Sequence, residues 1–310
     1  MSTRILASSM LVGRGLFQLG ERFPELCIAP YRSIAWTTGL PSAEALVVLL
    51  SEPITLADLD LAPHLRVIGT YSVGTNHLPQ EACRERGIRI VNTPGVLTES
   101  TADLALTLLL ALTRRVAEGE ALVRSGAWKG WAPEQLLGTS LSGKVCGILG
   151  SGPIGRAFAK RVWALGMKPV FWDRDGRNHP VDFGAGIAKR LPLKELLPLS
   201  SVLSLHCPLT EETRGILDRK MLGLLPQGAI LINTARGGVL DESAALEKLQ
   251  SGRLGGVGLD VYEGEPRVNP AWFTAPGAVL LPHLGSATRE TREAMAQLLC
   301  AGVAQALSEA

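Results

Sequence analysis

The stretch VCGILGSGPIGRAFAKRVWALGMKPVFWD, residues 145–173, has the order of one supersecondary unit. An apolar run at 145–149 enters the glycine-rich turn GSGPIG at 150–155, a helical pattern continues to Leu165, and a second apolar run ends at Asp173. A strand, a glycine turn, a helix and a strand that ends in an acid form the βαβ unit that binds dinucleotides. This order predicts a nicotinamide cofactor.

The three glycines of the turn have separate expected roles. Gly150 permits the tight turn, Gly152 lets backbone N–H groups approach a pyrophosphate, and Gly155 lets the helix pack closely on the strand. The N-terminus of the following helix then faces the anion. We therefore assign all three glycines to the cofactor site.

The acid at the end of the second strand bears on the choice of cofactor. Asp173 is expected to accept hydrogen bonds from the adenosine ribose hydroxyls and to repel a 2′-phosphate. This favours NAD over NADP, although Arg174 and Arg177 soften the preference. We therefore expect NAD as the cofactor.

The composition favours a globular protein whose ligands are small molecules. The chain has 310 residues, 46% of them hydrophobic, and a formal net charge of +2. Because there is no basic run and aromatic residues are few, neither nucleic acid nor a membrane surface is favoured as a partner. The most apolar stretch, Ala102–Leu112, is far shorter than the roughly 20 residues that span a bilayer. The five cysteines form no CxxC pair, which suits a reducing cytoplasm, and no metal site is expected.

Apolar runs typical of strands occur in two series along the chain. The first series comprises Arg4–Ala7, Ala45–Leu50, Arg66–Tyr71 and Ile88–Asn92. The second comprises the run at 145–149, the run around Val170, Val202–His206, Ala229–Asn233, Val257–Asp260 and Val279–Leu281. Helical stretches separate the strands, among them Gly13–Arg22, Thr55–Asp60 and Pro79–Arg86. Such alternation indicates parallel sheets with crossover helices.

The two series predict an α/β fold with two doubly wound parallel-sheet domains, a Rossmann dinucleotide-binding domain inserted in a flavodoxin-like substrate domain. A helix is expected over Thr98–Val116, with Thr98 as its N-cap, followed by a loop rich in glycine and tryptophan at 126–138. The last helical segment is expected to return to the first domain. The substrate (catalytic) domain is therefore predicted at 1–97 and 286–310, and the dinucleotide-binding domain at 98–285.

Three ionisable side chains follow strands of the second series. Arg236 follows the strand at 229–233, Glu265 lies in the loop behind Asp260, and His283 follows the last strand. In an open parallel sheet, ligands lie beyond the carboxyl ends of the strands, so these side chains are expected at one edge. Arg236 suits a substrate carboxylate, and His283 suits proton exchange as general acid or base. Glu265 would orient the imidazole and favour its charged form.

The chain resembles the D-isomer-specific 2-hydroxyacid dehydrogenases over nearly its whole length. The resemblance rests on NTPGVLTESTADLAL at 92–106, the glycine turn, LHCPLTEETRGI at 205–216, INTARGGVLDE at 232–242, LDVYEGEP at 259–266 and LPHLGSAT at 281–288. It implies a two-domain enzyme, usually a homodimer, whose catalytic residues are Arg236, Glu265 and His283. It also implies that N–H groups of Val73 and Gly74 receive the substrate carboxylate.

The same resemblance implies further contacts with the cofactor. Asp260 would hold the nicotinamide carboxamide, and the remaining contacts are assigned to Pro153, Ile154, Cys207, Pro208, Thr213, Thr234, Ala235, His283 and Gly285. His206 also stands near the predicted cofactor. A structural role as a polar side chain in the wall of the cofactor crevice is at least as consistent with the sequence as a chemical role. Cys207 is interpreted as wall, because nothing nearby in sequence would activate its thiol. The other histidines, His64, His77 and His179, are expected to be solvated.

The resemblance implies hydride transfer to the carbonyl carbon of a small 2-oxo acid, with His283 protonating the oxygen to give a D-2-hydroxy acid. The segment at 92–106 is most similar to the glyoxylate and hydroxypyruvate reductases. Closure of the domains would exclude water, with hinges near Thr98 and Ser286. Trp131 is equally consistent with a loop anchor and with contact to a partner subunit. Two alternatives remain open, a phosphoglycerate dehydrogenase-like enzyme and a dinucleotide sensor resembling the family's transcriptional corepressors.

Overall fold

The computed structural model describes residues 4–11, 13–174, 176 and 179–309. The chain forms two compact units, one made of residues 1–97 and 286–310 and the other of residues 98–285. The second unit is thus an insertion in the sequence of the first. Arg177, one of the two arginines expected to soften the preference for NAD, lies outside the described residues.

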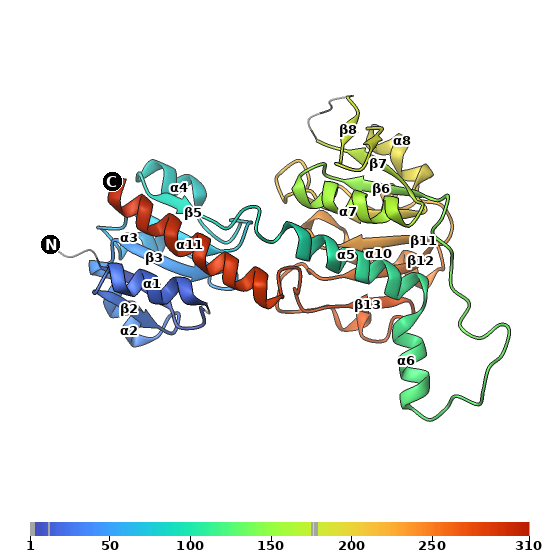
Figure 1. Cartoon of the computed structure of the whole chain (residues 1–310), viewed down its shortest axis with the longest axis horizontal. Coiled ribbons are helices and arrows are strands. Elements are labelled where there is room, and N and C mark those ends of the chain that lie inside the picture. The colour runs from blue at the N-terminus through green and yellow to red at the C-terminus, as the bar shows by residue number, and fades with distance from the viewer. Residues whose placement is uncertain (1–3, 12, 175, 177–178, 310) are drawn as a thin grey trace. The chain divides into compact units, whose positions relative to one another are not determined.

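The first unit is a five-stranded parallel sheet with helices on both faces (Figure 1). Its strands are β1 (Ile5–Ser8), β2 (Leu26–Ala29), β3 (Ala45–Leu49), β4 (Val67–Tyr71) and β5 (Arg89–Val91). Its helices are α1 (Arg14–Arg22), α2 (Ile34–Gly39), η1 (Leu40–Ser42), α3 (Leu56–Asp60), α4 (Gln80–Glu85) and α11 (Arg289–Glu309). The strands pair in the order β2-β1-β3-β4-β5. This is the strand order of flavodoxin-like doubly wound sheets, so the predicted fold class is confirmed here.

The strands of the first unit present alternate residues to two helix layers, as the period of two requires. On one face, Leu46 of β3 belongs to a buried cluster with Trp36 of α2 and Leu59 of α3. On the other face, α1 and α11 lie side by side (Figure 1). There α11 approaches β4 so closely that a Cβ atom at Gly69 would come within 2.6 Å of Val303. The C-terminal helix is therefore an integral layer of this unit.

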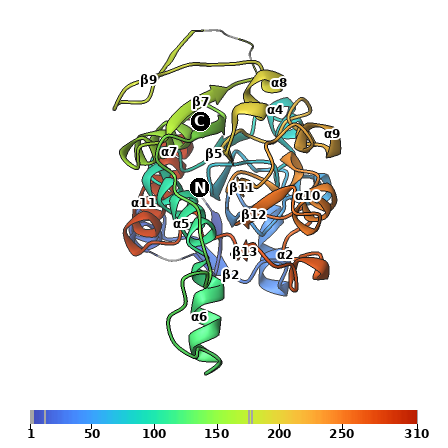
Figure 2. The same cartoon turned by 90° about the vertical axis from the view of Figure 1, so that its right-hand side faces the viewer.

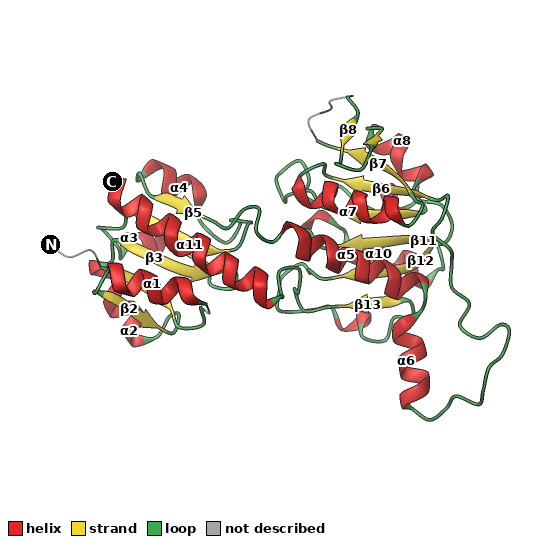
Figure 3. Ribbon diagram, in the orientation of Figure 1, coloured by secondary structure: helices red, strands yellow, loops and turns green. Residues whose placement is uncertain are grey.

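The second unit contains a six-stranded parallel sheet (Figure 3). Its strands are β6 (Val145–Leu149), β7 (Lys168–Trp172), β10 (Val202–Leu205), β11 (Ala229–Asn233), β12 (Leu254–Leu259) and β13 (Ala278–Leu280), and a separate antiparallel hairpin is formed by β8 (Val181–Asp182) and β9 (Ile187–Ala188). Its helices are α5 (Thr98–Thr113), α6 (Val116–Arg124), α7 (Pro153–Ala164), α8 (Leu193–Leu196), η2 (Leu197–Leu199), α9 (Arg219–Leu222), η3 (Gly237–Val239), α10 (Glu242–Gln250) and η4 (Pro270–Trp272). The strand order is β13-β12-β11-β10-β6-β7.

This order reverses at β6, which pairs with β7 on one side and with β10 on the other. A Rossmann sheet has the same reversal beside its first strand, and ligands bind beyond the carboxyl ends of the strands at that point. The third Rossmann strand is reduced to a short segment that pairs with β7, in which Arg190 lies opposite Phe171. The predicted doubly wound architecture is confirmed for this unit too.

The core of the second unit has two layers, one on each face of the sheet. Figure 2 shows α5 and α7 on one side of the sheet and α9 and α10 on the other. Leu108 of α5 and Phe158 of α7 pack with Ile148 of β6, and Leu246 of α10 joins Leu231 of β11 in the opposite cluster. Strands buried on both faces explain why their sequences are almost continuously apolar.

The structure departs from the sequence-based elements in three places. The single helix expected over Thr98–Val116 ends at Thr113, because Arg115 adopts a left-handed conformation (φ 51°), and α6 starts afresh at Val116. Strand β2, an edge strand of which only Ala29 is buried, was not expected. The hairpin of β8 and β9 was not expected either, since strands of two residues are too short to show a period. Of the helices in the described ranges, none combines the length and apolar character needed to cross a bilayer.

Candidate active site

The glycine turn follows β6 and leads directly into α7. Gly150 has φ 107°, and a Cβ atom there would come within 2.8 Å of the backbone of His206 and Cys207. A Cβ at Gly155 would collide with the carbonyl oxygen of Gly150, whereas nothing lies within 4 Å of the position of a Cβ at Gly152. The turn is thus closed against its neighbouring strand and open outward at Gly152, which fits the approach of a pyrophosphate to backbone N–H groups at the start of α7.

A second observation at the same edge of the sheet fits a bound nucleotide. Thr234 follows β11, and its hydroxyl is buried and has no hydrogen-bond partner among the described residues. A buried polar atom without a partner costs free energy, so it is usually satisfied by a ligand or by water. Together with the open turn, Thr234 indicates that this edge fits the dinucleotide that the sequence predicts.

Asp173 lies beside the glycine turn, as expected, and both of its carboxylate oxygens have partners. The backbone N–H of Ser151 donates to Oδ1 at 2.7 Å, and Nε of Arg190 forms an ion pair with Oδ2 at 2.9 Å. A carboxylate oxygen offers about two lone-pair positions, so Oδ1 retains capacity for a ribose hydroxyl, whereas Oδ2 is buried against Arg190. Ser151 and Arg190 were not predicted as site residues. Ser151 stands at a variable position of the glycine motif, and Arg190 lies outside the motif.

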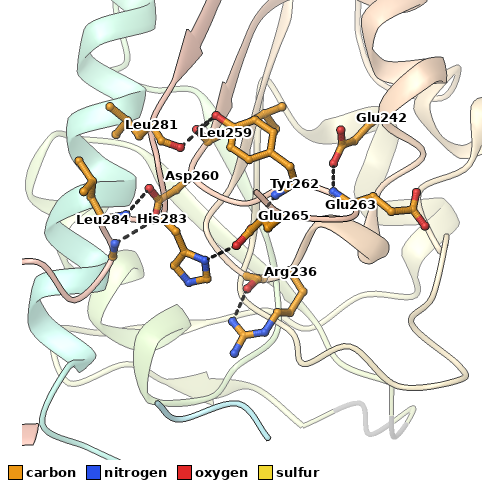
Figure 4. A network of polar contacts seen from close by, with 12 residues as sticks. Arg236, Glu242, Leu259, Asp260, Tyr262, Glu263, Glu265, Leu281, His283 and Leu284 are labelled. Atoms are coloured by element: carbon orange, nitrogen blue, oxygen red, sulfur yellow. Dashed lines mark hydrogen bonds and ion pairs between the residues drawn. The ribbon is translucent and has the colours of Figure 1, made fainter. Parts of the chain in front are cut away.

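His283 and Glu265 form the central pair of the site (Figure 4). The Nδ1 atom of His283 lies 2.7 Å from Oε2 of Glu265, and the other carboxylate oxygen accepts the N–H of Tyr262 at 2.8 Å. Burial alone would raise the pKa of Glu265, but its hydrogen bond to His283 and the charge of that ring hold the pKa below its usual range. The carboxylate is thus ionised and oriented toward the imidazole.

The backbone that carries His283 is held in an unusual conformation. His283 has φ 57°, a left-handed value that is uncommon for residues other than glycine. Asp260 fixes this segment, since its carboxylate accepts the N–H groups of Leu284 at 2.6 Å and Gly285 at 2.8 Å. Burial raises the pKa of Asp260, which is 1% exposed, although these N–H groups oppose the rise. The expected contact of Asp260 and Gly285 with a nicotinamide stays a prediction.

Arg236 follows β11 and completes the group of three side chains that the sequence singled out. Its guanidinium donates to the carbonyl oxygen of Ala235 at 2.7 Å, and Figure 4 shows it beside the pair formed by Glu265 and His283. Burial lowers the pKa of Arg236, and the charge of Glu265 opposes this. An arginine stays protonated in proteins, so a cation, an anion and an imidazole meet here.

Two residues that the sequence did not single out hold the loop that carries Glu265. Glu242, at the start of α10, accepts the N–H of Glu263 at 2.5 Å, and the hydroxyl of Tyr262 donates to the carbonyl oxygen of Leu281 at 3.0 Å (Figure 4). The latter contact ties the loop of Glu265 to the segment before His283. In sequence, Glu242 has the pattern of an ordinary acidic residue in the first turn of a helix. Only the burial of its side chain, which the structure shows, sets it apart from such residues.

Three other predicted cofactor residues make contacts within the protein, and their contact with a cofactor stays a prediction. The ring of His206 packs against Phe158, its Nε2 atom is 2.8 Å from Oγ of Ser204, and burial lowers its pKa to about 3. Burial raises the pKa of Cys207 to about 11, which agrees with its interpretation as wall. The hydroxyl of Thr213 donates to the carbonyl oxygen of Pro208 at 2.6 Å, inside its own loop. These three side chains shape the edge of the sheet.

The predicted substrate-binding loop lies in the first unit, directly after β4. The side chain of Asn92 donates to the carbonyl oxygen of Val73 at 2.8 Å, and the hydroxyl of Ser72 donates to that of Gly74 at 2.7 Å. His77 is half-buried, with Nε2 at 2.8 Å from Oγ1 of Thr70, so the expectation that it is solvated was wrong. Among the described residues, no group of three or more potential ligands is arranged for a metal ion.

Residues 106–285 match the family model described as D-isomer specific 2-hydroxyacid dehydrogenase, NAD binding domain. The chain belongs to the D-isomer-specific 2-hydroxyacid dehydrogenase family. One relative in this family is a glyoxylate reductase of Thermococcus litoralis, 45% identical over 260 residues, which are 83% of this chain and 78% of the relative. The predicted family and enzyme class are therefore confirmed, and the chain is an oxidoreductase.

Solved structures of the dehydrogenase family superpose on nearly the whole chain. An NADPH-dependent glyoxylate/hydroxypyruvate reductase of Sinorhizobium meliloti, in complex with NADP and malonate, has a TM-score of 0.88 at 31% identity, covering 99% of this chain and 94% of that one. A D-lactate dehydrogenase of Aquifex aeolicus, complexed with NAD and lactic acid, has a TM-score of 0.86 at 26% identity, covering 99% and 96%. Similar proteins thus include complexes with either dinucleotide.

Proposed function

We propose that this dehydrogenase reduces a small 2-oxo acid such as glyoxylate or hydroxypyruvate to the corresponding 2-hydroxy acid, of D configuration where the product is chiral, with NADH as cofactor. The proposal rests above all on the pair of His283 and Glu265 at 2.7 Å with Arg236 beside it. A proton donor next to a carboxylate-binding cation is what reduction of an anionic ketone or aldehyde requires. The glyoxylate reductase relatives support the same class of substrate.

His283 is the proposed general acid for reduction and general base for oxidation. Since Nδ1 faces Glu265, the proton exchanged with the substrate oxygen is carried at Nε2. Glu265 fixes the ring and stabilises its protonated form, and Arg236 binds the substrate carboxylate. The nicotinamide, when bound, supplies or accepts the hydride. We also propose that the N–H groups of Val73 and Gly74 bind the substrate carboxylate.

The residues proposed to hold the cofactor surround the turn after β6 and the ends of β10, β11 and β12. Backbone N–H groups at the start of α7 would bind the pyrophosphate, Asp173 the adenosine ribose, and Thr234 would use its unpaired hydroxyl. The wall would be formed by Pro153, Ile154, His206, Cys207, Pro208, Thr213, Ala235, Asp260 and Gly285. NAD is preferred in this proposal, because Asp173 places a carboxylate where NADP carries its 2′-phosphate.

We further propose that the protein is a homodimer in the cytoplasm. Helix α6 buries none of its residues within the chain, and it exposes Val116 and Val123. The loop that follows exposes Trp128 and Trp131, the latter to 84%. Apolar surface of this extent on one projecting segment supports a subunit contact, in which Trp131 would take part. The scattered cysteines support a reducing compartment.

The purified protein is expected to oxidise NADH with glyoxylate or hydroxypyruvate and to use NADPH less efficiently. The measurement is kcat/KM for a panel of 2-oxo acids with both cofactors, with dissociation constants of the cofactors from fluorescence titration. The panel includes the 2-oxo acid substrate of phosphoglycerate dehydrogenases, so that this alternative is compared directly. Tight binding of NADH without turnover of any 2-oxo acid would instead favour a dinucleotide sensor.

Replacing Glu265 with glutamine is expected to move the pH profile of 2-oxo acid reduction toward lower pH by about one unit. The pKa of Glu265 lies below its usual range, so its carboxylate is ionised throughout the neutral range and stabilises a positive ring. Glutamine keeps an oxygen that can accept a hydrogen bond but has no charge, so it no longer favours the charged form of the imidazole. The profile of kcat/KM against pH measures this.

The matched control is Glu263→Gln, which removes a carboxylate from an exposed side chain in the same loop. Its pH profile should coincide with that of the native protein. If the pH profile of kcat/KM in the Glu265 variant coincided with that of the native protein, the carboxylate of Glu265 would have no influence on the pH dependence of the reaction.

A further inference from the structure

Arg190, which the glycine motif does not include, reaches the acid of the cofactor turn. Its backbone pairs with β7 opposite Phe171, because the N–H of Leu191 donates to the carbonyl oxygen of Phe171 at 2.9 Å. Asp173 follows β7 directly, two residues after Phe171, so the segment that pairs with β7 brings Arg190 next to the end of this strand. The short third strand thus fixes where this guanidinium lies.

The contacts of Arg190 close a triangle around Asp173. Its Nε atom pairs with Oδ2 of Asp173 at 2.9 Å, and Nη2 donates to the hydroxyl of Ser151 at 3.1 Å. The N–H of Ser151 in turn donates to Oδ1 of Asp173 at 2.7 Å. The side chains of Arg190 and Asp173 are only 10% and 16% exposed. Water and salt therefore screen this pair far less than a surface pair.

The neighbouring arginine is placed differently. Arg174 lies 3.5 Å from Glu212, and the two side chains are 51% and 69% exposed. A pair this exposed is screened and contributes little. Of the two arginines described near Asp173, Arg190 is therefore the one whose charge acts strongly on this carboxylate.

Neutralisation of Asp173 has a consequence for cofactor choice. A lone carboxylate at the ribose would repel the 2′-phosphate of NADP at full strength, whereas a paired carboxylate repels it much less. We propose that Arg190 is a specificity-determining residue, which limits this repulsion and so sets how strongly the enzyme prefers NAD over NADP. The inference deepens the proposed function and rests on it, because it concerns the same cofactor site.

Direct binding measurements on the intact protein test this role. The ratio of the NADPH and NADH dissociation constants, from fluorescence titration, is expected to rise about tenfold in Arg190→Met, since an uncompensated carboxylate then faces the phosphate. Arg190→Lys keeps the charge and should leave the ratio within about twofold. The matched control Arg219→Met removes an exposed arginine of the same unit, paired with Glu247 and assigned no part in cofactor binding, and should also leave the ratio within about twofold.

A second pair of variants covers the case in which Arg190→Met folds poorly, because a buried acid without its partner destabilises the fold. Asp173→Asn leaves the guanidinium beside the ribose without an acid, and the ratio is expected to fall about tenfold. The double variant Asp173→Asn with Arg190→Met removes both charges, and its ratio should return toward the native value. An equal fall in the double variant would overturn the role of Arg190.

The outcomes separate this inference from the proposed function. If the native protein binds neither dinucleotide, both are wrong. If it binds NADH and reduces 2-oxo acids while Arg190→Met leaves the ratio unchanged, only the inference about Arg190 is wrong. The inference is also wrong if Arg219→Met changes the ratio as much as Arg190→Met does.

Discussion

Replacing His283 with asparagine is expected to lower kcat for 2-oxo acid reduction by about 10²–10⁴-fold, the usual contribution of a positioned general acid. NADH affinity should stay within about twofold of the native value, because the cofactor is proposed to be held mainly by the turn after β6. Asparagine is chosen because His283 has φ 57°, and asparagine adopts left-handed backbone more readily than alanine does. The substitution thus removes the proton donor and keeps the loop.

The comparison uses steady-state kinetics for kcat and fluorescence titration for NADH binding. His64→Asn provides the matched control, since His64 is exposed and lies in the first unit. It should retain native kinetics. If the His283 variant retained more than about a tenth of native kcat, another group would have to supply the proton, since such a loss is below the range for general acid catalysis.

The fold and the main site could be predicted because they depend on local patterns and on one topological rule. The runs at 145–149 and 229–233 are apolar throughout, as strands buried on both faces are, and they form β6 and β11 as expected. Parallel strands bring their carboxyl ends to one edge. For that reason Arg236, Glu265 and His283, distant in sequence, were expected together and lie together.

Contacts that depend on register and on exact backbone conformation could not be predicted. Arg190 follows the unexpected hairpin of β8 and β9 and lies in a strand segment too short to leave a periodic signal in the sequence. Its ion pair with Asp173 therefore could not be predicted. The hydrogen bonds from the N–H groups of Leu284 and Gly285 to Asp260, beside the left-handed His283, were likewise not expected, while the contact of Asp260 with the nicotinamide stays a prediction. The inward direction of the His206 ring likewise follows from its place at the end of β10.

Replacing Arg236 with alanine is expected to lower kcat/KM for the 2-oxo acid by about 10²–10⁴-fold. Two charge-assisted hydrogen bonds to a carboxylate contribute about 3–6 kcal/mol, which corresponds to this range. Most of the effect should be a higher KM, since a carboxylate is bound equally in the ground state and the transition state. Arg236→Lys should recover only part of the loss, because an ammonium group lacks the two-pronged geometry of a guanidinium.

The decisive comparison uses a substrate without the negative charge. A 2-oxo amide of the same size should be a poor substrate of the native protein, and Arg236→Ala should reduce its turnover little further, so the selectivity for acid over amide should collapse. Arg267→Ala, which removes an exposed arginine just after the loop of Glu265, should keep both the KM and the selectivity. An equal loss with acid and amide in the Arg236 variant would mean that Arg236 supports the fold of the site and does not bind the carboxylate. Because Arg236 is half-buried beside Glu265, a thermal melt of each variant separates lost stability from lost binding.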